Sequence, residues 1–549
     1  FLTSTFQTYQ FNDSLHIENI CARPDSITHI STTFDNNLCY FPENPVFKGT
    51  VVRAMAFKEG WIKSPTITHT YFVTSFGRER YSLPIFSLSV GKNDLFDYNI
   101  GIYTAGQDFD EWRMANPESP IDWQTKANFH RIGIESEKRS NLEFFDVNDN
   151  FSAFSHEIGF RINGYESRRR PLKSIRLYSR SEYGQPNFNY KFFKNLKDDQ
   201  FKTLILRNSG QDYFQTMLRD AAIQQMVKDL IPDIQEVMPA ILFINGEYWG
   251  IHNLRERFDK DYLKRVYDID AGNIDFIVNY NEVREGDTVH YNETKEYIKQ
   301  HGLAEKEHYE YIQTRIDVDN FRDYQIINIF ADNHDWPGNN LEYWRMRTSQ
   351  YNPNAPTGQD GRWRWFVKDL DFGFGLFGLE EALQHNMLQF ATAAGGLEYP
   401  NPDWATFLLR KFLENEEFKI SFINRFADLL NTTFLPSVMQ NKILEAENKI
   451  DIEVSEHITR WKNISSYQLW LEQMEVMYHF AEQRPAYQNQ HIIDFFDLSG
   501  QYSLEVDVSN HWFGKVRINS IEITDDTPGI NESAYPWSGN YYLGIPIEV

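Results

Sequence analysis

Two short polar clusters contain the residues of this chain that could perform chemistry together. The first lies in "NHDWPGNNLEYWRMR", where Asp335, Asn339 and Asn340 surround a Pro-Gly turn ahead of a strand-like run. The second lies in "RWRWFVKDLDFGFG", which contains Asp369 and Asp371. Carboxylate and amide oxygens are hard ligands that suit Mg²⁺ or Mn²⁺ better than zinc. If folding brings the clusters together, the chemistry they predict is metal-assisted phosphoryl transfer.

The order and spacing of these residues match two protein-kinase motifs. Asp335 is followed five residues later by Asn340, as in the catalytic loop "HRDxxxxN", and His334 directly precedes Asp335. The tripeptide "DFG" begins at Asp371. Each motif alone also occurs by chance, and Asn-rich Pro-Gly loops usually only turn the chain. Together and in this order they favour a phosphotransferase site.

A helix and a hairpin are expected to position the two clusters. The run "VDNFRDYQIINIFADN" has apolar residues at helical spacing behind Asp317 or Asp319 as the N-cap, so it predicts a helix that ends at the first cluster. The strand-like runs "LEYWRMR" and "RWRWFVKDLDFGFG" are separated by a polar, turn-rich segment, which predicts an antiparallel hairpin. Asn340 is therefore expected to face Asp371. Alternate strand residues share a face roughly 6 to 7 Å apart, so Asp369 should lie beside Asp371.

A basic segment lies upstream in a chain that is otherwise acidic. "RINGYESRRRPLKSIRLYSR" contains seven arginines and lysines, which favours a local anion site. Period-2 alternation places Lys173 with Ile175 and Leu177 on the apolar face of a strand, so its ammonium needs a partner. A nucleotide phosphate would serve. A salt bridge to a carboxylate, or a stem that carries the ammonium out to solvent, would serve as well.

Six blocks of the sequence resemble the spore coat protein H (CotH) kinase family in that family's order. They are "LPIFSLSVGKNDLFDYNIGIYTAG", "GFRINGYESRRRPLKSIRLYSRSEYG", "LILRNSGQD", "FINGEYWGIHNLRERFD", "DNHDWPGNNLEYWR" and "FVKDLDFGFG", and they span roughly residues 80 to 380. The resemblance implies an α+β fold of the atypical protein-kinase type. It also implies that ATP and Mg²⁺ or Mn²⁺ bind between a small β-rich lobe and a helical lobe.

The resemblance also implies roles for the residues of the two clusters. Asp335 matches the catalytic aspartate that orients the acceptor hydroxyl. Asn340 and Asp371 match metal ligands. Asp369 is an alternative to Asp371, since the family pattern contains both, and the sequence leaves open which is the main ligand.

Further matches concern binding of the nucleotide. Lys173 matches the phosphate-binding lysine, and the segment "GYESRRRP", with Arg168, stands where other kinases have a glycine-rich loop. "FINGEYWGI" resembles the hairpin that leads to the hinge between the lobes, near Glu256. No acidic partner of Lys173 is identified, although Asp220 or a neighbouring acid would suit.

Three regions are expected along the 549 residues. Residues 1–79 include a hairpin pattern around Lys58 and resemble the C-terminal β-sandwich module of chitobiases and hexosaminidases. Residues 80–492 form the kinase-like region, β-rich to about residue 255 apart from one helix at 213–230, and mostly helical afterwards. Residues 493–549 again alternate with period 2 and predict a small β-domain, either whole or truncated.

Composition limits the range of partners. Fifty-four basic against 78 acidic residues give a formal charge of −24, which disfavours binding to nucleic acid. No apolar run is long enough to span a membrane. The chain begins at Phe1, which permits removal of an export signal, and the family resemblance implies a secreted or cell-surface location. Cys21 and Cys39 could form a disulfide or remain two thiols.

The sequence therefore predicts a CotH-type kinase that transfers the γ-phosphoryl group of ATP to a protein hydroxyl, of serine or threonine. The alternative is a non-catalytic surface, coat or adhesin-like protein that keeps the fold as a scaffold. The intact set Asp335, Asn340 and Asp371 favours the enzyme, because a scaffold has no need of it.

Overall fold

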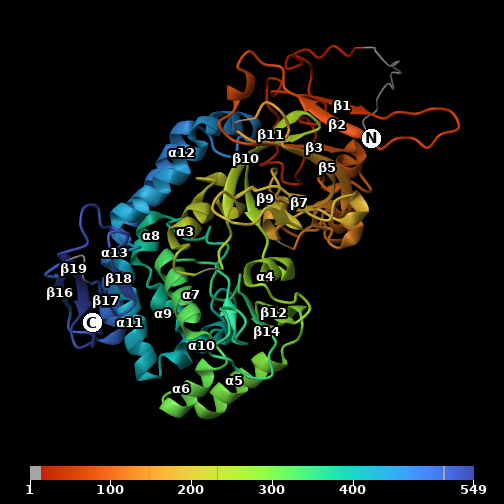
Figure 1. Ribbon diagram of the computed structural model, residues 1–549. Helices are drawn as coiled ribbons and strands as arrows, with labels where there is room; N and C mark the ends of the chain where they lie inside the picture. The colour runs from red at the N-terminus through yellow and green to blue at the C-terminus, as the bar shows by residue number, and fades with distance from the viewer. Residues whose placement is uncertain (1–13, 123, 148, 232, 511–513) are drawn as a thin grey trace. The chain divides into compact units, whose positions relative to one another are not determined.

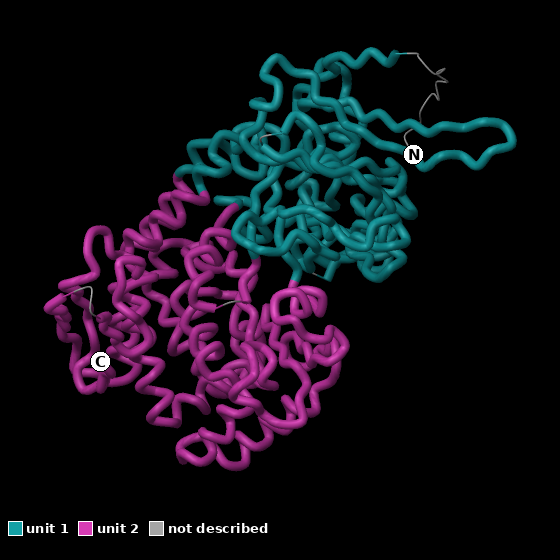
Figure 2. Tube along the Cα trace, in the orientation of Figure 1, with its two compact units in different colours: residues 1–217, 236–257, 447–471 teal, residues 218–235, 258–446, 472–549 magenta. Residues whose placement is uncertain are grey.

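The computed structural model describes residues 14–122, 124–147, 149–231, 233–510 and 514–549. The chain forms two compact units that are not contiguous in sequence (Figure 2). The first unit comprises residues 1–217, 236–257 and 447–471, and the second comprises 218–235, 258–446 and 472–549. The fold is a mixture of helices and sheets, as the sequence predicts.

A closed seven-stranded barrel forms the first unit's core (Figure 1). Its strand order is β10-β11-β9-β6-β5-β4-β3, antiparallel except where β10 meets β3. The strands are β3 (Ile85–Val90), β4 (Lys138–Phe145), β5 (Phe154–Ile162), β6 (Ile175–Tyr178), β9 (Thr203–Arg207), β10 (Val237–Ile244) and β11 (Glu247–Glu256). Shorter elements of this unit are α1 (Lys92–Phe96), α2 (Gly106–Ala115), β7 (Phe188–Asn189) and β8 (Gln200–Phe201).

Two of the barrel strands are buried along their whole length. All six residues of β3 and all ten of β11 are buried, although β3 contains two serines and half of β11 is polar or charged. Phe86, Leu142 and Leu242 belong to one core cluster inside the unit. The expected β-rich region up to about residue 255 is therefore a barrel.

The segment before the barrel contains the predicted hairpin, β1 (Thr50–Ala54) and β2 (Ile67–Tyr71), which pair antiparallel. The preceding residues dock directly on the barrel. The carboxylate of Glu247 accepts hydrogen bonds from the backbone N–H groups of Ser26, Ile27 and Thr28. A single two-stranded sheet over the described residues 14–79 does not confirm a β-sandwich module, which needs two sheets.

The second unit combines helices with a four-stranded antiparallel sheet of order β13-β12-β14-β15. The predicted helix 213–230 is confirmed over a shorter range, as α3, and strands β12 and β13 join the sheet in addition to the predicted pair. The elements are α3 (Arg219–Val227), α4 (Lys260–Tyr267), β12 (Ile274–Val278), β13 (Glu282–Glu285), α5 (Val289–His301), α6 (Lys306–Gln313), α7 (Val318–Ala331), β14 (Glu342–Met346), β15 (Arg364–Trp365), α8 (Leu379–Gln384), α9 (Met387–Ala391), α10 (Asp403–Phe412) and α11 (Glu416–Leu430). Two long helices, α12 (Pro436–Trp461) and α13 (Tyr467–Phe496), contribute residues to both units.

Helix α7 is the predicted helix ahead of the first polar cluster. Its N-cap is Asp317, whose carboxylate accepts a hydrogen bond from the N–H of Asn320 at 3.2 Å. The helix ends at Ala331, where Asp332 adopts a left-handed conformation with φ of 54°. The chain therefore turns sharply just before Asp335.

The described part of the C-terminal region after α13 contains two pairs of strands. β16 (Gln501–Val506) pairs with β19 (Trp537–Tyr542), while β17 (Val516–Ile518) pairs with β18 (Ile521–Ile523). The alternation of the sequence is a local property and does not reveal that a later strand supplies the partner of β16.

The two cysteines, Cys21 and Cys39, are both free thiols. Among the described residues, no helix is sufficiently long and apolar to cross a membrane.

Candidate active site

The loop after α7 brings Asp335, Asn339 and Asn340 into direct contact. Asp335 is 9% exposed. Its Oδ2 accepts hydrogen bonds from the side-chain nitrogen of Asn340 at 2.6 Å and from that of Asn339 at 3.0 Å. Its Oδ1 accepts one from the hydroxyl of Tyr399 at 2.6 Å. Two of the five clustered residues predicted from the sequence, Asn339 and Asn340, thus donate to the carboxylate of a third, Asp335.

The carboxyl group of Asp335 is more basic than an ordinary aspartate. Burial raises its pKa to about 6, the hydrogen bond from Tyr399 lowers it, and the charge of Asp369 raises it. The effect of Asp369 shows that this second carboxylate lies near the first. Two neighbouring carboxylates repel each other, and a bound cation would relieve that repulsion.

Two residues of the site have left-handed backbone conformations, which residues other than glycine rarely adopt. Asn340 has φ of 58° and Asp369 has φ of 56°. Asparagine and aspartate tolerate this left-handed region better than other non-glycine residues, and such conformations concentrate at functional sites. Both residues therefore lie on tight local bends.

The predicted hairpin is present, but one detail of it was predicted wrongly. β14 pairs antiparallel with β15, with Tyr343 opposite Trp365. That Asn340 faces Asp371 stays a prediction, because both residues lie beyond the paired residues of this ladder. Strand β15 ends at Trp365, and the left-handed Asp369 interrupts the extended chain. Asp369 and Asp371 are therefore not alternate residues on one strand face.

The segment around Asp371 is fastened to the end of α7. Asp371 is 2% exposed. The N–H of Phe374 donates to the carbonyl of Ala331 at 2.9 Å, and a Cβ on Gly373 would lie only 2.6 Å from that carbonyl oxygen. The N–H of Leu370 donates to Asp220 Oδ1 at 2.8 Å. Glycine in the "DFG" tripeptide permits this close approach of two backbones.

A second close approach brings Tyr399 to Asp335. The N–H of Gly338 donates to the carbonyl of Pro400 at 2.6 Å, and a Cβ at this glycine would lie 2.5 Å from the same oxygen. Tyr399 is 64 residues from Asp335 in the chain. No local sequence pattern indicates this contact, which sequence analysis therefore missed.

Lys173 lies just before β6 rather than on a strand, but it is fully buried in the first unit, as the alternation predicts. Its ammonium donates to the carbonyls of Arg168 at 2.6 Å and Arg170 at 3.0 Å, and lies 3.7 Å from the ring centre of Phe129. Burial lowers its pKa well below the usual range. Among the described residues no carboxylate forms an ion pair with it. That Lys173 faces the Asp335 cluster stays a prediction.

The two remaining predicted binding residues also belong to the first unit. Arg168 donates to the carbonyls of Gly164, His130 and Arg131, so backbone oxygens engage its guanidinium. Glu256 ends β11, is 3% exposed, and accepts from the N–H of Glu236. The chain passes into the second unit after residue 257, close to the predicted hinge. The nucleotide-binding roles of both residues stay predictions.

A family model described as CotH kinase protein matches residues 160–488, which is more than half of the chain. The chain belongs to the CotH kinase protein family. The match includes both polar clusters and Lys173, so membership confirms the family predicted from the motifs and indicates a kinase-like function. No curated protein matches this CotH kinase protein.

Proposed function

We propose that this CotH kinase protein is a metal-dependent protein kinase that transfers the γ-phosphoryl group of ATP to a serine or threonine hydroxyl of another protein. One observation carries the proposal. Asp335 is desolvated, is oriented by two asparagines through one oxygen, and lies near a second carboxylate, Asp369. A scaffold would have no use for this combination.

Asp335 acts as the base that orients the acceptor hydroxyl. Its Oδ2 is held by two amide groups, whereas Oδ1 has one donor, Tyr399. A carboxylate oxygen accepts two hydrogen bonds, so Oδ1 can also accept from the substrate hydroxyl. With a pKa of about 6, Asp335 is ionised at neutral pH and still more basic than usual. The hydroxyl oxygen bonds to the γ-phosphorus, its proton passes to Asp335, and ADP leaves.

The donor set fits a hard divalent cation. Asn340 uses its amide nitrogen to donate to Asp335, which leaves its amide oxygen for a metal. Asp369 and Asp371 supply carboxylates, and Mg²⁺ or Mn²⁺ is preferred by such oxygen ligands. When bound, the cation would neutralise the charge of the ATP phosphates.

Lys173 supports phosphate binding indirectly, without contacting the phosphates itself. Because its ammonium is buried and already engaged by two carbonyls, it fastens the turn that contains Arg168 and Arg170. A direct phosphate contact would require the ammonium to leave those carbonyls. The turn that it shapes takes the place of a glycine-rich phosphate loop.

Two substitutions test the division of roles. Asp335→Asn should leave affinity for ATP with Mg²⁺ or Mn²⁺ nearly unchanged, because its role is exercised in the transition state, and should lower turnover by about 10²- to 10⁴-fold. Asp371→Asn should weaken metal-dependent ATP binding as well as turnover. Asp319→Asn is the matched control, since that side chain is 83% exposed. The measurements are ATP affinity and transfer of radiolabelled phosphate to a generic protein acceptor.

Three results would contradict the proposal in different ways. Equal loss of ATP binding in both variants would refute the separate roles. Unchanged transfer in Asp335→Asn would remove that residue from the chemistry. Absence of ATP binding and of transfer by the unaltered protein would favour the non-catalytic scaffold.

We also propose that the protein acts outside the cytoplasm, secreted or at the cell surface. The support is the family resemblance, in which such locations are typical. Protease digestion of intact cells that express the natural protein should remove it while sparing a cytoplasmic marker. Protection of the protein equal to that of the marker would refute this location.

A further inference from the structure

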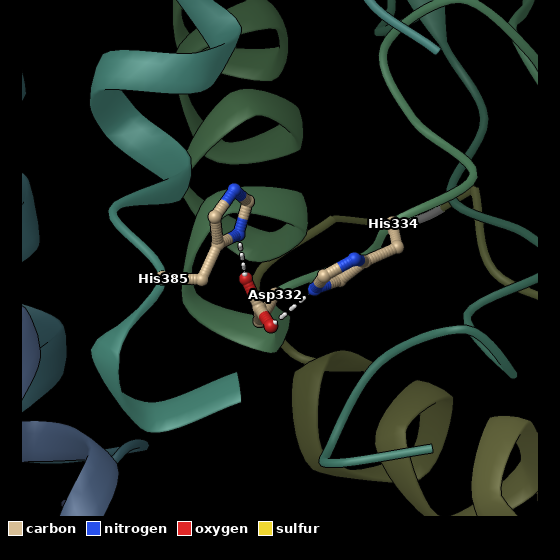
Figure 3. A group of neighbouring side chains, drawn as sticks. All are labelled: Asp332, His334 and His385. Carbon is tan, nitrogen blue, oxygen red and sulfur yellow. Dashed lines mark hydrogen bonds and ion pairs between the residues drawn. The ribbon is translucent and has the colours of Figure 1, made fainter. Parts of the chain in front are cut away.

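A buried aspartate next to the candidate active site contacts two histidines. Asp332, at the C-terminal end of α7, is 1% exposed. Its Oδ2 lies 2.8 Å from Nε2 of His334, and its Oδ1 lies 2.7 Å from Nδ1 of His385 (Figure 3). Both histidines are partly exposed, with 23% and 27% of their side chains accessible. The proposed phosphoryl transfer uses none of the three residues.

An arginine holds the backbone on both sides of this group. Arg484 is fully buried. Its guanidinium donates to the carbonyls of Ile329 and Phe330, just before Asp332, and to those of Ala382, Leu383 and His385. One side chain thus ties the end of α7 to the end of α8. The carboxylate and His385 are therefore positioned by rigid elements rather than by free loops.

The three side chains offer the ligand set of a nitrogen-rich metal site. One oxygen of Asp332 and one ring nitrogen of each histidine all lie within 4.8 Å of one another. Ligand atoms of a tetrahedral zinc site, with bonds of about 2.0 to 2.2 Å, lie roughly 3.3 Å apart. The two histidines contact different oxygens of Asp332, at 2.8 and 2.7 Å, so binding of one ion would require the rings to leave these hydrogen bonds and converge on a common point.

We propose that Asp332, His334 and His385 bind one Zn²⁺ ion, with a fourth position open to water. Imidazole and carboxylate ligands suit zinc, whereas the oxygen-rich set around Asp335 suits Mg²⁺ or Mn²⁺. Two neutral histidines free the required nitrogens by moving their protons to the other ring nitrogen, so no proton need be lost. Two centres of different ligand chemistry then lie on one loop.

Nearby charges act on this site in both directions. Burial lowers the pKa of His334, but the hydrogen bond to Asp332 and the charges of Asp332 and Glu381 raise it overall, so the surrounding negative charge favours a cation. Arg484 opposes a cation, but its charge is spread over five backbone carbonyls. Metal binding at this site would restrain the backbone of the neighbouring loop. The ion would join α8 to the start of the loop that contains Asp335, and would fix that loop.

The alternative is that the histidines only hydrogen-bond to Asp332. A direct measurement of metal binding distinguishes this alternative from a zinc site. Metal-free protein, kept in excess Mg²⁺ to fill the oxygen-rich site, is titrated with Zn²⁺ against a chromophoric chelator, and with Co²⁺ for its visible absorption spectrum. We expect about one Zn²⁺ per chain, and Co²⁺ bands typical of a four-coordinate site with nitrogen ligands.

His385→Gln should weaken Zn²⁺ binding by more than about 100-fold, because it removes a ligand rather than an outer contact. His308→Gln is the matched control, since His308 lies beside another histidine, His301, at 4.7 Å between ring centres, and could bind zinc at the surface. Circular dichroism of both metal-free variants verifies folding, and Asp332→Asn provides a second ligand test. Zn²⁺ binding that is absent, or that persists in His385→Gln and disappears in His308→Gln, would overturn the proposal. These measurements need no kinase activity, so failure of the proposed function would leave them unaffected.

Discussion

At the scale of single residues, Asp335 shows how a useful base is made at some cost in stability. Its carboxylate is held in a buried position near Asp369, an arrangement that disfavours the charged form. Hydrogen bonds from Tyr399 and the two asparagines recover part of that cost. Active sites commonly combine desolvation with a specific charged neighbour in this way.

This environment predicts a pH-dependent stability difference in metal-free protein. The folded-state pKa of Asp335, about 6, lies above the ordinary value of 3.8. The contribution of Asp335 to the free energy of unfolding is therefore fully present below pH 4 and is lost as the pH rises through 6. Asp335→Asn removes this loss, so the variant should gain stability relative to the unaltered protein between pH 4 and 6. The gain should reach on the order of 2 to 3 kcal/mol above pH 6.

Urea denaturation in the presence of a chelator, at pH 4, 5, 6 and 7, measures the difference. Asp319→Asn, at an exposed position of the same unit, should show no such trend. A stability difference between Asp335→Asn and the unaltered protein that is independent of pH would show that Asp335 titrates normally.

At the scale of elements, periodicity and capping correctly predicted the helices and strands that are determined by residues close together in the sequence. The helix that begins after Asp317 and the pairing of "LEYWRMR" with "RWRWFV" followed from spacing alone. The errors arose where the backbone leaves regular conformations. Left-handed Asn340 and Asp369 bend the chain at the site, and strand alternation cannot be extended through such residues. The contact from Tyr399 depends on tertiary folding and has no local pattern.

Gly338 shows how one element depends on the approach of another. In Gly338→Ala the new Cβ would lie 2.5 Å from the Pro400 oxygen and 2.6 Å from Cδ of Pro402. The segment with Tyr399 should move away from Asp335, so we expect a destabilisation of about 1 to 3 kcal/mol and a higher pKa of Asp335. Urea denaturation measures the first effect, and carboxyl-selective NMR titration measures the second.

Gly272→Ala is the matched control in the same unit, because its Cβ would meet nothing closer than 3.5 Å and its φ is ordinary. It should change stability by less than about 1 kcal/mol. Equal effects of the two substitutions would show that the approach to Pro400 does not restrict position 338.

At the scale of the whole molecule, the region matched by the family is not a complete structural unit. The match begins at residue 160, inside β5, so β3 and β4 of the closed barrel precede it. A fragment cut at that position would leave β6 and β10 without the strands that close the sheet, and open sheet edges invite aggregation. Strands β3 and β4 are therefore part of the kinase-like fold, and any shortened chain should keep them.

The N-terminal segment is tied to the barrel through Glu247 in β11, which is 3% exposed. Although burial alone would raise the pKa of Glu247, hydrogen bonds from Ser26, Ile27 and Thr28 lower it overall. In the full chain, Glu247→Gln should therefore cost about 2 to 3 kcal/mol, since hydrogen bonds to a charged acceptor are weakened. In a chain that begins at residue 49 those donors are gone and water replaces them, so the same substitution should cost close to zero. Urea denaturation of the four proteins completes a cycle in which the two changes are strongly non-additive. Equal costs of Glu247→Gln in both chain lengths would mean that residues 14–48 do not hold the barrel through this carboxylate.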